Sequence, residues 1–543
     1  MNIVIFENRN ILTLQSRSSI DVQYLAAITK KSGYPTKSFL FENKDEKYIQ
    51  SILYELDTDI IIIDFHSSKR ECTLNIVDTL KKKNPRLKIV FFGLEATLNA
   101  ALLMNEINSL DFIMYGECDL TITYLCDIIK NDDDPKQCEG IFYRKSGEIY
   151  RTPARSALID LDSLPFPDLE ISKNIFNDNK SPAVFFTMRT SKGCTGKCSF
   201  CIYMRKNKAT KNHPVWIGRT MKNVIEEIKY VQNEFKGKRL VIEFLDASFE
   251  DPDKKEKKRI IEFLDLIEQN NLSVTFSILT KANTWDDSDY NLIVRMKELG
   301  LYLVQVGVES LSNEGLHIFN KGTNIIDIEK SMSVFKKSGV DVRTFIIMFH
   351  PYITFDQLRK NALFIKDNNC ADNIALFTTN ITLYPDSQLF QRIVIDGLLT
   401  TSSINRVFNF NFENGLVNRL YSKIASFNRK KRENYLNMFE TINNELYLYK
   451  SWVERIDGFQ TIKNEMDDYY DAYSIIKKEL GDKQYNIFNN MLDLAEADTP
   501  ENQLDSCISY WEDTLSFYTE KLENLRMKNK IKLSRKNIIL FNT

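Results

Sequence analysis

Three cysteines in one short loop are the residues whose types and spacing most directly indicate chemistry. Cys194, Cys198 and Cys201 are separated by three and then two residues. Thiolates are soft ligands that suit iron–sulfur clusters and zinc. A zinc site normally has four ligands, and a cluster held wholly by protein has four cysteines. Three local thiols would therefore leave one iron of a four-iron cluster open to a small molecule.

Two other interpretations of this loop compete with the cluster. Zinc could recruit His213 as a fourth ligand, or the thiols could be reduced cysteines that lie together by coincidence. The next cysteine, Cys370, is remote and no second closely spaced pair follows, which favours the cluster. Gly193 and Gly196 interrupt the thiols and suit a tight loop that aims backbone N–H groups inward.

The loop, with Phe200 immediately before Cys201, resembles the cluster loop of radical S-adenosylmethionine (SAM) enzymes. The resemblance implies a 4Fe–4S cluster bound by the three cysteines, with the amino and carboxyl groups of SAM on the open iron. It also implies that one electron, supplied by a reductant such as flavodoxin or ferredoxin, cleaves SAM. The products would be methionine and a 5′-deoxyadenosyl radical that removes a hydrogen atom from substrate.

The bulk composition sets limits on the chain as a whole. Its 543 residues predict three or four domains. A net charge of −2 and a pI near 6.3 give no global field that would recruit nucleic acid. No stretch approaches the roughly 20 apolar residues of a membrane span, and the first eight residues lack a basic leader. Nine cysteines without a regular framework predict a reducing, cytoplasmic setting.

Residues 1–145 alternate between apolar strands and amphipathic helices. We expect strands at 2–6, 37–41, 57–64, 87–93 and 112–115. Runs rich in β-branched residues between helices predict a doubly wound, Rossmann-like parallel sheet. Ligands of such sheets bind at the carboxyl ends of the strands.

Three segments of this region are similar to the cobalamin-binding domain that precedes one large radical SAM subfamily: 24–34, 93–97 and 115–121. The resemblance implies bound cobalamin, with Gly93 and His66 as candidate contacts. Phe92 stands where the family has a second glycine, and the family's cobalt-binding Asp-x-His-x-x-Gly signature is absent. His66 could face a corrinoid or be a loop histidine in water. A degenerate domain kept for structure or substrate contact is the alternative.

A proline-punctuated connector, 146–182, precedes a second alternating region, 183–397. We expect six strands there, at 183–188, 240–246, 274–279, 302–309, 342–349 and 374–383. This order predicts a partial (β/α)6 barrel, whose chemistry lies at the carboxyl ends of the strands.

Motifs at these strand ends resemble the SAM-binding motifs of the family. Glu309-Ser310, two residues after Gly307, is similar to the pair that contacts the SAM ribose and methionine, and Asp246 stands near the place of the methionine amino group. Both carboxylates could instead cap strand–helix turns. Lys281 stands where the family often has an arginine. Two further segments, 349–351 with His350 and 384–387, depart from the family's motifs.

The final region, 398–543, is predicted to be helical, with helices near 433–456, 458–480 and 502–528. Aromatic residues at helical spacing there indicate core packing, or alternatively the wall of a substrate pocket.

The resemblance therefore implies cobalamin-dependent methylation of an unactivated carbon in a small-molecule or peptide precursor. A radical SAM enzyme that catalyses a non-methylating rearrangement, cyclisation or epimerisation is the first alternative. A binding or sensing protein with a structural cluster is the second, and the strand-end position of Glu309 argues against it.

Overall fold

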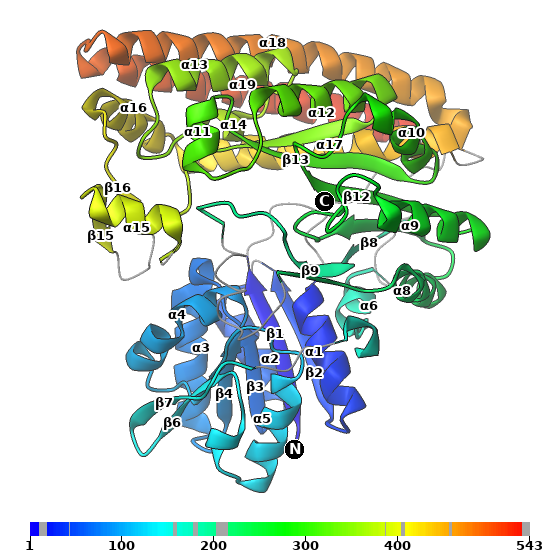
Figure 1. The fold of residues 1–543 in the computed structure, drawn as a ribbon, viewed down its shortest axis with the longest axis vertical. Coiled ribbons are helices and arrows are strands. Elements are labelled where there is room, and N and C mark those ends of the chain that lie inside the picture. Colours follow the sequence, from blue (N-terminus) through cyan, green and yellow to red (C-terminus); the bar gives the residue numbers. More distant parts are fainter. Residues whose placement is uncertain are drawn as a thin grey trace.

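The chain folds into three parts that lie one above another (Figure 1). The computed structural model describes residues 1–9, 19–42, 44–155, 160–176, 183–201, 215–385, 387–402, 408–455 and 459–534. The N-terminal part is a sheet covered by helices, the middle part is an open barrel, and long helices form the third part. The α/β class predicted from the sequence, with its helical C-terminal region, is confirmed.

The N-terminal sheet has the strand order of a doubly wound fold. In spatial order its strands are β2 (Thr36–Glu42), β1 (Ile3–Arg9), β3 (Ile60–Asp64), β4 (Lys88–Phe92), β5 (Phe112–Met114), β6 (Ile141–Lys145) and β7 (Glu148–Arg151). The first five are parallel, and β6 and β7 are antiparallel. The order 2-1-3-4-5 places the topological switch point between β1 and β3, where a ligand crevice is expected.

Helices cover both faces of this sheet: α1 (Ile20–Lys31), α2 (Glu46–Tyr54), α3 (Arg70–Lys83), α4 (Leu94–Glu106) and α5 (Thr121–Asn131). Alternate residues of one strand enter opposite cores. Ile60 and Ile62 of β3 pack on one face, and Ile61 and Ile63 on the other. The hairpin β6–β7 continues the sheet into 148–151, which the sequence analysis assigned to the connector. The connector also contains the helix α6 (Glu170–Phe176).

The middle part is a curved parallel sheet of five strands, in the order β14 (Asp341–Ile346), β13 (Leu301–Glu309), β12 (Val274–Lys281), β11 (Arg239–Phe244) and β8 (Ala183–Met188). A small hairpin, β9 (Ser191–Gly193) and β10 (Trp216–Gly218), follows β8. The helices are α8 (Met221–Glu234), α9 (Lys258–Gln269), α10 (Tyr290–Glu298), α11 (Asn313–Ile318), α12 (Ile325–Ser338), α13 (Phe355–Asp367), α14 (Ile374–Thr378) and α15 (Gln388–Ile395).

The sixth strand expected at 374–383 is a helix in its first half. Asn373 caps α14 by accepting a hydrogen bond from the Ala375 backbone N–H. A short apolar run fits a strand or a helix equally well, so the cap decides the outcome. The segment that follows α14 reaches the sixth position of the barrel through a single bridge between Phe349 and Asn380.

The third part consists of α16 (Gly415–Ala425), α17 (Arg429–Arg455), α18 (Lys463–Glu496) and α19 (Glu501–Ser534), preceded by the hairpin β15 (Leu399–Ser402) and β16 (Phe408–Phe410). Helix α17 packs against the barrel: the Trp452 indole N–H donates to Thr275 Oγ1 at 3.0 Å, and Arg343 pairs with Glu440 at 2.6 Å. Trp452 and Trp511 are fully buried, so these aromatic side chains form core.

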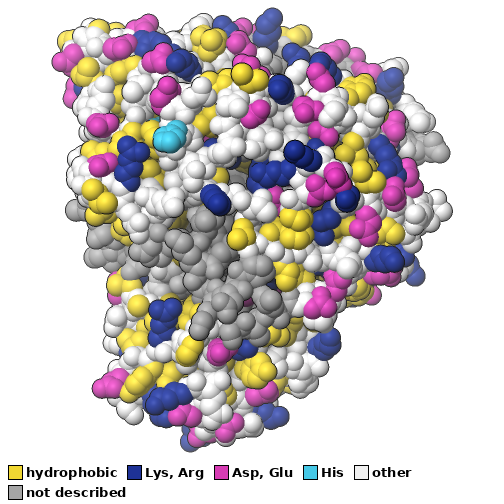
Figure 2. All heavy atoms as spheres, in the orientation of Figure 1, with side chains coloured by type: hydrophobic (Ala, Val, Ile, Leu, Met, Phe, Trp, Pro, Cys, Tyr) yellow, Lys and Arg dark blue, Asp and Glu magenta, His cyan; other side chains and the backbone are white. Residues whose placement is uncertain are grey.

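The surface carries both signs of charge. Figure 2 shows lysine, arginine and acidic side chains interspersed over one face, in keeping with the net charge of −2. Among the described residues, no helix is long and apolar enough to cross a membrane.

Candidate functional site

The three cysteines lie at the carboxyl end of β8, beside a cavity of about 630 Å³. The cavity is also lined by the carboxyl ends of β11, β12 and β13. Gly193 begins the loop at φ +87°, and a Cβ there would lie 2.2 Å from the Val215 carbonyl oxygen. Glycine is therefore required at that position, where the hairpin β9–β10 turns the chain toward the cavity.

A carboxylate and a lysine hold the middle of this cysteine loop. Asp251 accepts from the Thr195 backbone N–H at 3.0 Å and from its hydroxyl at 2.7 Å. Lys281, at the end of β12, donates to both Asp251 oxygens at 2.6 and 2.7 Å and to Thr195 Oγ1 at 2.9 Å. Burial raises the pKa of Asp251, but the bonds from Lys281 and Thr195 outweigh it and lower the pKa. The pair holds the loop backbone and leaves the thiols facing the cavity.

The end of the loop is fixed by backbone contacts with other parts of the barrel. The Ser199 N–H donates to the Phe319 carbonyl at 2.8 Å, and its hydroxyl donates to the Ile318 carbonyl at 2.7 Å. The Leu389 N–H donates to the Ser199 carbonyl at 3.1 Å. Phe200 packs edge-on against Phe319, with ring centroids 5.2 Å apart. These contacts preorganise the loop.

The three thiols are more widely spaced than the ligands of a zinc ion. Sulfur atoms around a tetrahedral zinc, with Zn–S bonds of about 2.3 Å, lie about 3.8 Å apart. Among the described residues, the groups of three ligand atoms within 4.8 Å of one another do not include these cysteines. A Cβ on Gly196 would lie 3.3 Å from Cys194 Sγ and 3.9 Å from Cys198 Sγ, so glycine keeps the space between them open. His213, the alternative zinc ligand, lies outside the described residues.

Burial and nearby lysines act on the thiols in opposite directions. Burial raises the pKa of Cys194 and of Cys198, although nearby lysines oppose the shift. Free thiols here are therefore protonated, and a bound metal must displace their protons. Two lysines, Lys281 and Lys321, place positive charge near the thiols.

Asp246 lies at the wall of this cavity with its oxygens engaged by the start of the cysteine loop. It accepts from the Thr190 N–H at 3.0 Å, from the Thr190 hydroxyl at 2.7 Å and from the Ser191 hydroxyl. Burial raises its pKa, and these bonds oppose the shift. This geometry supports the capping role more directly than contact with SAM.

The two residues of the pair Glu309-Ser310 have different environments: one lines the cavity and the other is buried. Glu309 lines the cavity, and its carboxylate pairs with Lys321 at 3.0 Å. Its φ of +68° is rare for a residue other than glycine. Ser310 is 1% exposed, and its hydroxyl accepts from the Ser312 N–H at 3.2 Å. Ser310 therefore supports the turn behind Glu309.

Of the other motif positions, His350 is fully buried against Phe319, with ring centroids 5.0 Å apart. Burial lowers its pKa to about 3, so the imidazole is neutral. Asp386 lies outside the described residues.

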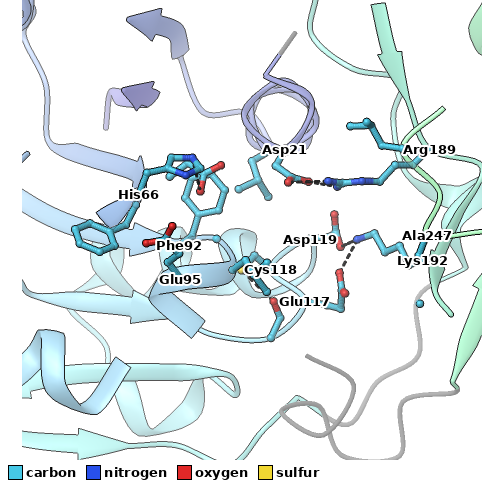
Figure 3. A pocket seen from close by; sticks show the side chains of 18 of the residues that line it. Asp21, His66, Phe92, Glu95, Glu117, Cys118, Asp119, Arg189, Lys192 and Ala247 are labelled. Atoms are coloured by element: carbon cyan, nitrogen blue, oxygen red, sulfur yellow. Dashed lines mark hydrogen bonds and ion pairs between the residues drawn. The ribbon is translucent and has the colours of Figure 1, made fainter. Parts of the chain in front are cut away.

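A second cavity, of about 240 Å³, lies between the N-terminal sheet and the cysteine loop (Figure 3). Lys192 of β9 pairs with Glu117 at 2.7 Å and with Asp119, and Arg189 pairs with Asp21, so ion pairs join the N-terminal part to the segment that follows β8 on one side of the cavity. The two cavities share three lining residues: Arg189, Leu245 and Ala247.

His66 and Gly93 both line this second cavity, and internal partners engage them. His66 Nε2 lies 3.0 Å from Glu7 Oε1 and 3.8 Å from Asp64 Oδ1. Burial would lower the pKa of His66, but Glu7 and Asp64 overcome it and raise the pKa to about 9. In this structure the Nε2 atom of His66 thus faces carboxylate oxygens of Glu7 and Asp64. A Cβ on Gly93, at φ +97°, would lie 2.1 Å from Asp64 Oδ1.

The position of the cavity fits a corrinoid: it lies at the carboxyl ends of the strands, beside the switch point. Gly93, Leu94 and Glu117 from below, and Ala247 from above, would hold the ring. Phe92, which is 2% exposed, forms part of the wall. The volume is below the 300–1,000 Å³ or so of typical ligand pockets.

Sequence reasoning did not identify Glu7, Asp251 or Lys321. Glu7 interrupts the apolar run of β1, and a carboxylate in a buried strand is a signal that could have been used. Asp251 pairs with Lys281, 30 residues away in the sequence, and Lys321 pairs with Glu309, 12 residues away. No local motif reveals pairs at these separations.

Comparison with known proteins agrees with this arrangement. Residues 188–365 match the model of the radical SAM superfamily. An uncharacterized methyltransferase from Pyrococcus horikoshii is 27% identical over 354 residues, which cover 65% of this chain and 73% of the relative. The anaerobic magnesium-protoporphyrin IX monomethyl ester cyclase of Rubrivivax gelatinosus is 26% identical over 387 residues, which cover 68% of this chain and 65% of the cyclase.

Two solved structures share the fold. The cobalamin-dependent SAM radical enzyme OxsB, with aqua-cobalamin and SAM bound, aligns with a TM-score of 0.67 and 16% identity, over 100% of this chain and 82% of OxsB. The radical SAM methyltransferase TsrM from Kitasatospora setae aligns with a TM-score of 0.56 and 14% identity, over 74% of this chain and 78% of TsrM. Residues 188–365 are therefore similar to the radical SAM superfamily, and the chain shares its fold with these two structures.

Proposed function

We propose that this protein is a cobalamin-dependent radical SAM enzyme that methylates an unactivated carbon of a small natural-product or peptide precursor. One observation carries the proposal: the cavity of the three thiols and the cavity at the switch point share a wall formed by Arg189, Leu245 and Ala247. A SAM site and a corrinoid site on opposite sides of that wall could serve one substrate. The structure of OxsB holds aqua-cobalamin and SAM, and that of TsrM holds a SAM analog, which supports both sites.

Each group of lining residues would hold a different cofactor. Cys194, Cys198 and Cys201 would hold a 4Fe–4S cluster, Glu309 would contact SAM, and the loops at Gly93 and Glu117 would hold cobalamin. When bound, these groups supply one-electron cleavage of SAM and transfer of a methyl group. The electron would come from a protein of the flavodoxin or ferredoxin class.

The protein itself contributes positioning and a dry site. Asp251 and Lys281 fix the thiol loop before any ligand arrives, which reduces the entropy lost on binding. Apolar side chains of the larger cavity, among them Leu245, Leu279 and Phe345, exclude water from the space beside the thiols.

A non-methylating radical reaction is the second candidate. The cyclase relative and a 4′-phospho-dehydrooxetanocin synthase from Priestia megaterium, 24% identical over 265 residues, favour it. The small volume of the second cavity and the bulk of Phe92 in its wall also favour it.

The test uses protein reconstituted anaerobically with iron and sulfide, mixed with hydroxocobalamin and desalted. We expect about four iron atoms per chain and near-stoichiometric corrinoid in the visible spectrum. With dithionite and SAM, it should form 5′-deoxyadenosine and also S-adenosylhomocysteine, the product of methyl donation. Protein that forms 5′-deoxyadenosine without retaining corrinoid supports the second candidate. Protein with a full cluster that leaves SAM intact overturns both.

A further inference from the structure

A carboxyl group lies deep in the larger cavity, inside the barrel. Glu243 of β11 and Gln305 of β13 both line that cavity. Glu243 precedes Asp246 by three residues, and Gln305 precedes Glu309 by four. A strand rises about 3.3 Å per residue, so both side chains lie roughly 10 Å or more below the strand ends. They therefore form the floor of the cavity, and the thiols lie at its mouth.

The hydrogen-bonding capacity of this floor is only partly used. Gln305 Nε2 donates to Glu243 Oε1 at 3.2 Å. In the part of the chain that the structure describes, no other hydrogen bond or ion pair reaches the Glu243 carboxylate. Ser277 pairs with Glu243 between β11 and β12, and its buried hydroxyl has no hydrogen-bond partner among the described residues. Buried polar groups are normally satisfied, so these atoms indicate a place for a ligand.

The charge of Glu243 is also unmatched within the described structure. Arg343 is close enough to affect the carboxylate, but it forms its ion pair with Glu440, at 2.6 Å. Burial raises the pKa of Glu243, and the bond from Gln305 and the charge of Arg343 oppose the shift. A buried carboxylate without a cation is costly. A cation that reached the floor would therefore be stabilised there.

Apolar side chains separate the floor from the mouth. Leu245, Leu279 and Phe345 line the cavity, and each lies on a strand or directly after one. A ligand that reaches Glu243 must pass these side chains, which favours an apolar body behind the cationic group.

Resting on the function proposed above, we propose that the substrate carries a primary amino group on an apolar chain or ring. Glu243 receives this ammonium at the floor of the cavity, and Gln305 holds the carboxylate in place. The apolar body of the substrate then extends along Leu245 and Leu279 toward the thiols. Glu243 is thus a residue that determines substrate specificity, at a distance from the cysteine loop.

The test compares two probes of equal length, hexylamine and hexanol. Binding of each to the reconstituted protein is measured by equilibrium dialysis. Because a buried charge pair is lost when one partner is removed, the wild type should bind hexylamine about 10-fold or more tightly than hexanol. Glu243→Gln keeps the shape and removes the charge, so the two affinities should then agree within about 2-fold. Glu243→Asp, which keeps the charge, should retain a preference for hexylamine.

Asp341→Asn is the matched control. Burial also raises the pKa of Asp341, but this residue begins β14, at the other end of the barrel, and pairs with Lys450 at 3.3 Å. The substitution should leave the preference for hexylamine unchanged. Iron content should be the same in all variants.

Binding of SAM distinguishes the substrate from the cofactor. The adenine of SAM also carries an amino group, so SAM affinity is measured in the same proteins. It should be unchanged in Glu243→Gln. A loss of SAM binding in that variant without a loss of the hexylamine preference assigns Glu243 to the cofactor and overturns the proposal. Equal affinities of the wild type for the two probes, with SAM still cleaved, overturn the amine site alone. A wild type that prefers hexylamine and leaves SAM intact overturns the proposed function and, with it, the substrate role of the site.

Discussion

The two cavities on either side of the shared wall use charged residues in opposite ways. At the cysteine loop, Asp251 and Lys281 bind the backbone and the Thr195 side chain, and the thiols stay open. At the switch point, Glu7 and Asp64 bind the functional side chain itself, and His66 is held as a cation. Both arrangements satisfy buried charges. In the first cavity the charged residues hold the backbone around the thiols, whereas in the second they lie against a side chain that lines the cavity.

The comparison of the two cavities shows that a side chain can bind a ligand only through atoms that its protein partners do not already occupy. A thiol has few strong hydrogen-bonding partners, so the surrounding charges fix the loop around it. An imidazole at a sheet edge attracts carboxylates, and the nearest one here is that of Glu7, 3.0 Å from His66 Nε2. We therefore expect changes at the two cavities to separate cluster binding from corrinoid binding.

The largest expected effect is at the cysteine loop. Replacing Cys194, Cys198 and Cys201 together with alanine should abolish the cluster, from about four iron atoms per chain to none, because it removes all three protein ligands. Iron content and visible absorption after anaerobic reconstitution measure this. Corrinoid retention should survive, since the thiols do not line the smaller cavity. Stoichiometric zinc in protein purified without oxygen, with no cluster absorption after reconstitution, would contradict the assignment.

The next effect is at Gly93. A Gly93→Ala substitution adds a Cβ where Asp64 Oδ1 lies, at a φ of +97°. We expect strain and overpacking to lower the local stability of β3 and β4 by about 2–4 kcal/mol. Hydrogen exchange of the amides in these strands reports that stability.

Gly33→Ala is the control for this substitution. Gly33 also has positive φ, +84°, but has nothing within 4 Å of the added Cβ. It should lose about 1 kcal/mol through backbone strain alone. Equal effects of the two substitutions would show that Asp64 moves aside freely.

The smallest expected effect is a shift in the pKa of His66. Glu7→Gln removes the closest carboxylate from His66, so the pKa of His66 should fall from about 9 toward its ordinary value of 6.5. Because the chain has four histidines, NMR titration with labelled histidine can follow it. The folded pKa lies above the unfolded one, so this charge stabilises the fold fully below about pH 6.5, and the contribution is lost as pH rises through 9. If His66 titrates at the same pH in the variant, Asp64 and not Glu7 causes the raised pKa.

Sequence reasoning predicted the fold, which is confirmed, and singled out the three cysteines as a candidate cluster site, because both depend on local patterns. The strands β1 to β5, β8 and β11 to β14 follow apolar runs such as Ile60 to Ile63, and the cysteine spacing lies within eight residues. The apolar run expected to be a strand at 374–383 begins as helix α14. The Asn373 side chain caps this helix, and the apolar pattern alone does not distinguish a helix from a strand. The ion pairs of Lys321 and His66 arise where distant segments meet in three dimensions, which spacing along the chain does not encode.

The central claim is that the cluster and the corrinoid face each other across one wall. Electron paramagnetic resonance of protein that holds cob(II)alamin, recorded before and after reduction of the cluster, tests this directly. Two paramagnets on either side of Arg189, Leu245 and Ala247 should interact, so reducing the cluster should broaden or split the cobalt signal. The triple cysteine variant should show no such change. A cobalt signal in the wild type that is identical before and after reduction would contradict the shared wall.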